Sequence, residues 1–70
     1  MEFILTKHAK KRMIERVINL EDIKQTIDFP EYEIKKGNKV EAYKHIKLKT
    51  LKVVYVIEGK FIKIITLIWK

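Results

Sequence analysis

His8, Arg12 and Arg16 recur at every fourth residue within TKHAKKRMIERVI, residues 6–18. On a helix, residues four apart lie one turn above another, so these side chains would form a single row. A neutral imidazole can accept a proton from a ribose 2′-hydroxyl, and a guanidinium can hold a phosphate through paired hydrogen bonds. The row therefore has the groups needed for metal-independent RNA cleavage, in which the 2′-oxygen attacks its own phosphate.

An ordinary solvated helix face explains the same row equally well. The arginines can pair with Glu15, or with acids of a following helix such as Asp22, and His8 is then an ordinary residue of the first turn. One histidine and two arginines on a lysine-rich helix form a pattern of low specificity. Both interpretations stay open at this stage.

A second basic group lies in EAYKHIKLK, residues 41–49, where aromatic and basic residues alternate. On a strand, such a pattern can stack bases and bind phosphates. We expect this region to hold an RNA backbone electrostatically through Lys44, His45, Lys47 and Lys52. The alternative is an exposed strand whose lysines only prevent edge-to-edge aggregation. Lys63, Thr66 and Trp69 on the last predicted strand can border a groove, although Trp69 is more readily explained by packing in the core or at an edge.

The net charge of +7 is unevenly distributed along the chain. Residues 1–18 carry a net charge of +3 and residues 35–52 carry +6, whereas residues 19–34 carry −4. If the two basic segments meet in space, they form a face that attracts polyanions such as nucleic acids. A lysine-rich surface that only keeps the protein in solution is the simpler alternative.

The composition excludes several classes of function. Seventy residues make one small domain, residues 1–70, without room for a large buried active site. There is no cysteine, and the two histidines are far apart, so neither a metal site nor a cofactor is expected. No signal peptide or membrane-spanning segment is recognised, and we expect a cytoplasmic protein that does not bind membranes.

Two helices are predicted in the first half of the chain. Thr6 is the expected N-cap of a helix from Lys7 to about Val17, whose buried stripe is Ala9, Met13 and Val17, with Ile14 and Ile18 beside it. Asn19 is the expected cap of a second helix, which ends at Phe29 because the following proline disfavours helical backbone.

The second half of the chain changes to an alternating pattern that predicts strands near residues 31–36, 39–47, 51–58 and 61–69. The strands at 51–58 and 61–69 are apolar on both faces and should lie in the middle of the sheet. The strand at 39–47 is more polar and should lie at the edge of the sheet. The stretch EFIL can form a short additional first strand. The predicted fold is α+β: two helices packed on one face of a roughly four-stranded antiparallel sheet.

Two segments also resemble a known family. HAKKRMIERVINLEDIKQTI and LKVVYVIEGKFIKIITLIW, which together cover most of the chain, are similar to the opening and closing of the small DUF4258 domains of bacteria and archaea. That family is grouped with the barnase, EndoU, colicin and RelE-like (BECR) folds. The resemblance implies a RelE-like fold and metal-independent cleavage of RNA, with Thr66 of the last strand joining His8, Arg12 and Arg16.

The leading hypothesis is therefore an endoribonuclease of the RelE-like toxin type. Its partners would be RNA and an antitoxin protein, and a weak homodimer is a further option. The alternatives are a module that binds nucleic acid or protein without catalysis, and a structural domain whose open sheet face pairs with a partner or with itself. Fold alone does not choose among them.

Overall fold

The computed structural model describes residues 2–70, which form two helices and a five-stranded sheet. In chain order the elements are β1 (Glu2–Leu5), α1 (Lys7–Glu15), α2 (Leu20–Asp28), β2 (Tyr32–Lys36), β3 (Lys39–Ile46), β4 (Lys49–Glu58) and β5 (Phe61–Trp69). The α+β class is confirmed. The optional first strand is present, and the other elements lie within two residues of their predicted bounds.

Both helices begin at the side chains that the sequence predicts as caps. The hydroxyl oxygen of Thr6 accepts a hydrogen bond from the backbone amide of Ala9 at 3.1 Å. In the same way, the side-chain oxygen of Asn19 accepts from the amide of Asp22 at 2.8 Å. Each cap satisfies an amide that has no partner within the first turn of its helix.

The first helix ends earlier than predicted because Val17 leaves the helical conformation, with φ at +51°. The amides of Val17 and Ile18 donate back to the carbonyls of Ile14 and Met13, which is the Schellman arrangement. This ending rotates Val17 toward solvent, and it is 87% exposed, while Ile14, still within the helix, lies on its solvent side and is 75% exposed. Their predicted place in the buried stripe is therefore wrong, whereas Ile18 is buried as expected.

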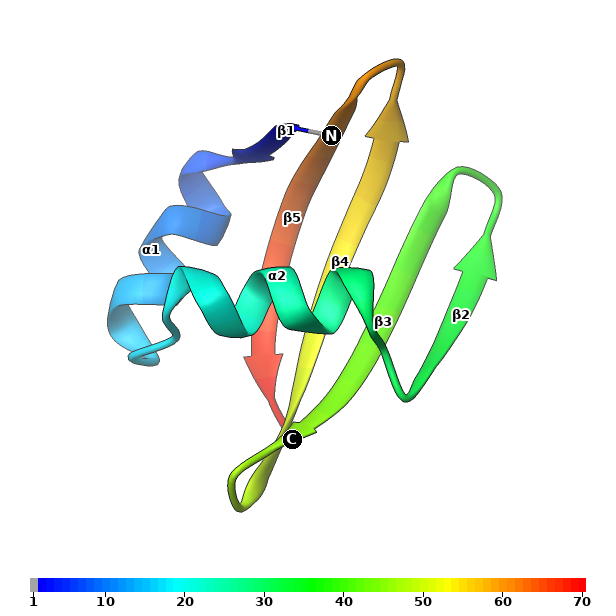
Figure 1. Cartoon of the computed structure of the whole chain (residues 1–70). Coiled ribbons are helices and arrows are strands. Elements are labelled where there is room, and N and C mark those ends of the chain that lie inside the picture. Colours follow the sequence, from blue (N-terminus) through cyan, green and yellow to red (C-terminus); the bar gives the residue numbers. More distant parts are fainter. Residues whose placement is uncertain (1) are drawn as a thin grey trace.

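The sheet has the order β1-β5-β4-β3-β2 and is mixed rather than purely antiparallel (Figure 1). The difference is β1, which pairs in parallel with β5, while every other pairing is antiparallel. β4 and β5 lie inside the sheet, as predicted. β3 also lies inside it, between β4 and β2, so its predicted edge position is wrong. Its polar residues misled because Lys39, Glu41 and His45 lie on the open face, while Val40 and Ala42 on the other face are buried.

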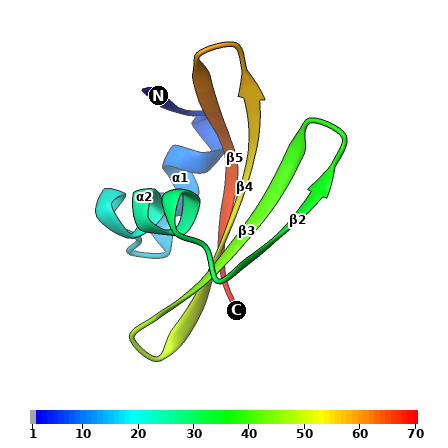
Figure 2. The same ribbon diagram turned by 45° about the vertical axis from the view of Figure 1, so that its right-hand side comes forward.

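Both helices cover the same face of the sheet and leave the other face open (Figures 1 and 2). α1 packs against β5 and β1, and α2 packs against β4 and β3. The core between these layers is made by Ala9, Ile18, Ile23, Ile27, Val40, Ala42, Leu51, Val53, Tyr55, Ile62, Ile64 and Leu67. On the open face, the rings of Tyr32 and Tyr43 stack with centroids 4.5 Å apart.

Candidate nucleic-acid interface

A basic groove lies where the end of α1 approaches the turn between β3 and β4. Its volume is about 410 Å³, and it is lined by Arg16, Val17, Ile46, Lys47, Leu48, Lys49 and Trp69. We call these seven residues the basic groove. Three of them are cationic, one is the only tryptophan of the chain, and none is acidic. The groove thus joins positive charge to an aromatic ring and to exposed apolar side chains.

Arg16 and Trp69 hold the two walls of the basic groove together. One Nη of Arg16 donates to the backbone carbonyl of Leu67, and the indole Nε1 of Trp69 donates to the carbonyl of Arg16 at 2.9 Å. These reciprocal bonds fix the end of α1 to the final strand. A guanidinium carries five N–H donors, so Arg16 keeps donors for an anion while it is anchored.

The lysines of the basic groove come from the β3–β4 turn. The ammonium of Lys49 lies 5.9 Å from the centroid of the Trp69 ring, within the range of a cation–π contact. Lys47 is exposed at the first position of the turn, and Leu48 beside it is 94% exposed. The tip of this hairpin therefore presents charge and apolar surface together, at the end of the sheet near the C-terminus (Figure 1).

The basic groove also holds the non-glycine residues with positive φ among residues 2–70, Val17 at +51° and Lys47 at +59°. The corresponding positions of the other two hairpin turns are glycines, Gly37 at +64° and Gly59 at +59°. An L-residue in this conformation costs about 1–2 kcal/mol relative to ordinary backbone. Both residues have local structural reasons for it, because Val17 ends α1 and Lys47 begins the β3–β4 turn.

The predicted helical row of His8, Arg12 and Arg16 divides between two environments. Arg16 lies in the basic groove, whereas His8 lies at the other end of α1, about 12 Å away along the helix axis. Arg12 forms an ion pair with Glu15 at 2.5 Å, as the alternative interpretation expects. This hydrogen bond, with the surrounding positive charge, holds the pKa of Glu15 below its usual value. His8 is exposed and has no hydrogen-bond partner within residues 2–70.

The predicted basic residues of the strands are also spread out. Lys47 lies in the basic groove, but Lys44 donates to the carbonyl of Phe29 at 2.8 Å, just after α2. Lys52 lies on the open face, 3.9 Å from a carboxylate oxygen of Glu41 and 5.7 Å from the centroid of the Tyr43 ring. His45 is exposed, with Nδ1 3.4 Å from the hydroxyl of Thr50. The structure thus gathers Arg16 and Lys47 and leaves these three outside the groove.

Thr66 lies on the face of the sheet opposite the helices. It pairs with Val54 across the β4–β5 ladder, while its neighbour Leu67 pairs with Val53 and points into the core beneath the helices. Consecutive residues of a strand point to opposite faces, so Thr66 faces away from α1. The structure does not bring Thr66 together with His8, which is exposed on the helix.

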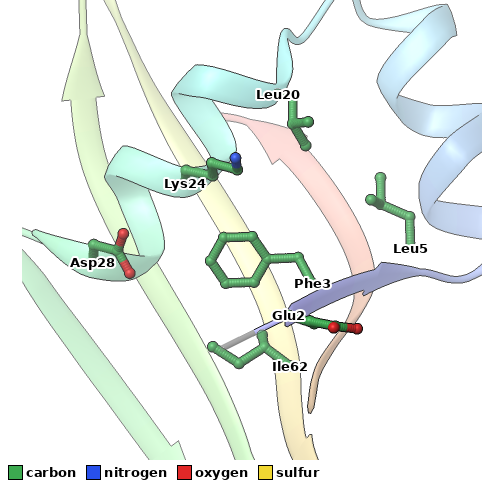
Figure 3. Close-up of a pocket in the computed structure, with 7 residues that line it drawn as sticks. All are labelled: Glu2, Phe3, Leu5, Leu20, Lys24, Asp28 and Ile62. Carbon is green, nitrogen blue, oxygen red and sulfur yellow. The ribbon is translucent and has the colours of Figure 1, made fainter. Parts of the chain in front are cut away.

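A larger cavity, of about 660 Å³, lies between β1 and α2 (Figure 3). Phe3, Leu5, Leu20 and Ile62 give it apolar walls, while Glu2, Lys24 and Asp28 lie at its polar rim. With two acids and one lysine, this cavity has no positive excess to attract a phosphate chain. The basic groove is the better candidate for a polyanion site.

Sequence reasoning missed Lys49 as a candidate site residue and favoured packing over a groove position for Trp69. The signal for Lys49 was present in the net charge of +6 on residues 35–52, but several lysines competed for the assignment. An aromatic residue near the end of a strand usually packs, and here Trp69 both packs and lines the groove. Only the topology reveals that the last strand and the β3–β4 turn end beside α1.

Within residues 2–70, no group of three or more histidine, cysteine, aspartate or glutamate side chains is arranged to bind a metal ion. In the same part of the chain, neither helix has the length and apolar character needed to cross a membrane.

These features define a small α+β domain with two helices on one face of a mixed sheet and a basic groove at one end. The family described as "Domain of unknown function (DUF4258)" matches residues 5–69, and the chain belongs to this family. The match covers both segments on which the resemblance rests. No curated protein and no solved structure is significantly similar to the chain.

Proposed function

We propose that the protein binds single-stranded RNA in the basic groove. The observation that carries the proposal is the convergence of Arg16, Lys47 and Lys49 around the Trp69 ring, without an acidic residue in the groove. Proteins bind single strands with this combination of groups, in which cations follow the phosphates and an aromatic ring stacks a base. This proposal corresponds to the non-catalytic alternative that the sequence leaves open.

Each group in the groove has a distinct part in this proposal. Arg16, anchored to the backbone of β5, offers its remaining donors to one phosphate in a fixed orientation. Lys47 and Lys49 contribute point charges on the facing hairpin tip. The indole of Trp69 supplies a stacking surface whose polar edge is already bonded to Arg16, so that stacking leaves no buried donor without a partner.

The test is the affinity for a fluorescently labelled single-stranded RNA, measured by anisotropy in the presence of a chelator. Lys47→Gly removes one charge from the groove and suits the local backbone, because the φ of Lys47 is +59°. It should weaken binding roughly fivefold, equivalent to about 1 kcal/mol, and lower the slope of log K against log salt by about 0.7.

The matched control is Lys60→Ala, which removes the same charge from the β4–β5 turn at the other end of the sheet (Figure 1). It should leave binding within a factor of two, apart from a small general loss of positive potential. Equal weakening by the two substitutions would show that only net charge matters and would contradict a site in the groove.

A second candidate function is RNA cleavage, favoured by the exposed imidazole of His8 on the same helix as Arg16. In this proposal RNA runs from the basic groove along α1 toward Arg12 and His8. His8 accepts the proton of a 2′-hydroxyl, the 2′-oxygen attacks the adjacent phosphorus, and the 5′-oxygen leaves after protonation by water. Arginine stabilises the charge of the intermediate. The toxin-like BECR fold, an antitoxin partner and a cytoplasmic location belong to this candidate.

Cleavage is tested with end-labelled RNA in a chelator, comparing wild type with His8→Ala and with His45→Ala. The second substitution removes the other histidine of the chain, which lies outside the groove. Loss of cleavage with His8→Ala alone, at unchanged RNA affinity, would support catalysis by His8. Equal cleavage by all three proteins, or none by wild type, would contradict it and leave the binding proposal intact.

A further inference from the structure

The outer edge of β2 is a free strand edge whose backbone groups are ready to pair. All five residues of β2 are exposed, and the strand bonds to β3 on one side only. Lys36 and Lys39 flank the two-residue turn at Gly37 and Asn38. Residues that flank such a turn exchange both backbone hydrogen bonds, and the bonded pairs then alternate along the ladder. The amides and carbonyls of Glu33 and Lys35 therefore face outward.

The charges along this edge are ordered so that the strand is complementary to itself. β2 and the residue before it read Glu31, Tyr32, Glu33, Ile34, Lys35 and Lys36, acidic at one end and basic at the other. An antiparallel two-fold pairing centred on Ile34 places Glu33 of each copy opposite Lys35 of the other. These are the residues whose backbone groups face outward, so ion pairs and ladder hydrogen bonds form at the same positions.

The remaining side chains suit the same register. Ile34, which is 41% exposed, meets Ile34 of the second copy on the open face of the sheet. On that face Tyr32, already stacked on Tyr43, lies opposite the ammonium-bearing Lys36 of the second copy. Apolar contact and a cation above an aromatic ring both stabilise cross-strand neighbours.

Neighbouring registers are disfavoured by the same charges. Moving the two-fold axis to Glu33 would place that carboxylate directly opposite its own copy, and moving it to Lys35 would oppose two ammonium groups. Like charges directly opposite in a sheet are destabilising. The pattern thus selects a single register, which an edge strand with scattered lysines would not do.

We propose that two copies of the chain associate through antiparallel pairing of their β2 strands, centred on Ile34, to form one continuous sheet. This inference is independent of RNA binding, because none of the residues that line the basic groove belongs to β2. An interface built on five residues of each copy is at the small end of specific interfaces, so we expect a dissociation constant of roughly 10–100 μM.

The experiment is sedimentation velocity over concentrations from about 1 μM to about 1 mM. The wild-type protein should change from monomer to dimer across this range. Glu33→Lys places lysine at both of the paired positions 33 and 35, and Lys35→Glu places a carboxylate at both, so each variant alone should stay monomeric. Mixed in equal amounts they should dimerise, since each supplies the charges that the other has lost. The double variant Glu33→Lys/Lys35→Glu reverses both charges and should dimerise like wild type.

Two matched controls reverse the same kinds of charge away from this edge. Glu58→Lys and Lys60→Glu lie at the β4–β5 hairpin and should leave dimerisation unchanged. Glu33 and Lys35 are also 3.5 Å apart within one chain, so the single variants lose a weak exposed ion pair. The mixture and the double variant separate this small effect from association. A wild-type monomer at every concentration, or a mixture that stays monomeric, would overturn the proposal.

Discussion

Two residues of the basic groove, Val17 and Lys47, have an unusual backbone conformation. Both adopt positive φ without being glycine, and Val17 is β-branched, which makes this conformation especially unfavourable. Burial of the side chain does not offset this conformational cost at either residue, since both side chains are exposed. The unfavourable conformation is required by the chain path at each position, because Val17 ends α1 in a Schellman motif and Lys47 begins the two-residue β3–β4 turn.

Replacing Val17 by glycine should stabilise the protein. Val17 occupies the position of the Schellman motif that glycine usually takes, and its side chain is 87% exposed, so little packing is lost. We expect the free energy of unfolding to rise by about 1 kcal/mol and the Tm by roughly 4–8 °C. Thermal unfolding measures this change. Ile14→Ala, at a 75% exposed position with helical backbone, should change Tm little; a fall in Tm for Val17→Gly would contradict the strain argument.

Tyr55 should make stability fall at alkaline pH. Burial raises the pKa of its hydroxyl above the ordinary value of 10, and the carboxylates of Glu33 and Asp28 raise it further. The folded state therefore holds this proton more tightly than the unfolded chain, so the stabilisation is complete below about pH 10 and is lost as pH rises above it. Urea unfolding near pH 8 and pH 10.5 should show a steeper decline for wild type than for Tyr55→Phe. Parallel declines would contradict this assignment.

At the scale of elements, the main connection is the one that ties α1 to the sheet. Thr6 follows β1 and caps α1. Its amide donates to the carbonyl of Ile64, and its hydroxyl lies 3.3 Å from the carbonyl of Ile65. Arg16 and Trp69 make the second connection at the other end of the helix. Because α1 is bound to β5 at both ends, Arg16 stays in place beside the β3–β4 turn.

Thr6→Ala should loosen this connection and lower stability. It removes the cap of α1 and the hydroxyl contact with β5 together, which we expect to cost about 1–2 kcal/mol of the free energy of unfolding. Thr6→Ser keeps the hydroxyl and should lose less than half as much. Chemical unfolding of both variants measures the difference. If the two substitutions cost the same, the hydroxyl is not the stabilising group.

The sequence predicts individual elements better than their arrangement. Caps at Thr6 and Asn19 and the alternation after Pro30 are local signals, and each produced the expected element. The parallel pairing of β1 with β5 joins the two ends of the chain, and no local pattern encodes such a contact. The predicted strands leave residues 48–50 between β3 and β4, whereas the turn is at Lys47 and Leu48, because it contains no glycine to mark it.

At the scale of the whole molecule, charge is separated in space as well as in sequence. The acidic segment forms α2 and the first residues of β2, whereas the basic end of α1 and the β3–β4 turn meet at the groove. The sequence identifies two basic segments that can meet, but it does not show which lysines stay free of intramolecular partners. Lys44 and Lys52 are engaged by Phe29 and Glu41, and such pairings follow from tertiary contacts alone.

The central claim is that RNA occupies the basic groove, and chemical-shift mapping tests it most directly. A short single-stranded RNA is titrated into ¹⁵N-labelled protein at low salt with a chelator. The indole N–H of Trp69, the only one in the chain, and the amides of Val17, Lys47 and Leu48 should shift together and saturate at one RNA per chain. Shifts confined to the cavity between β1 and α2, or to the open face of the sheet, would contradict the account.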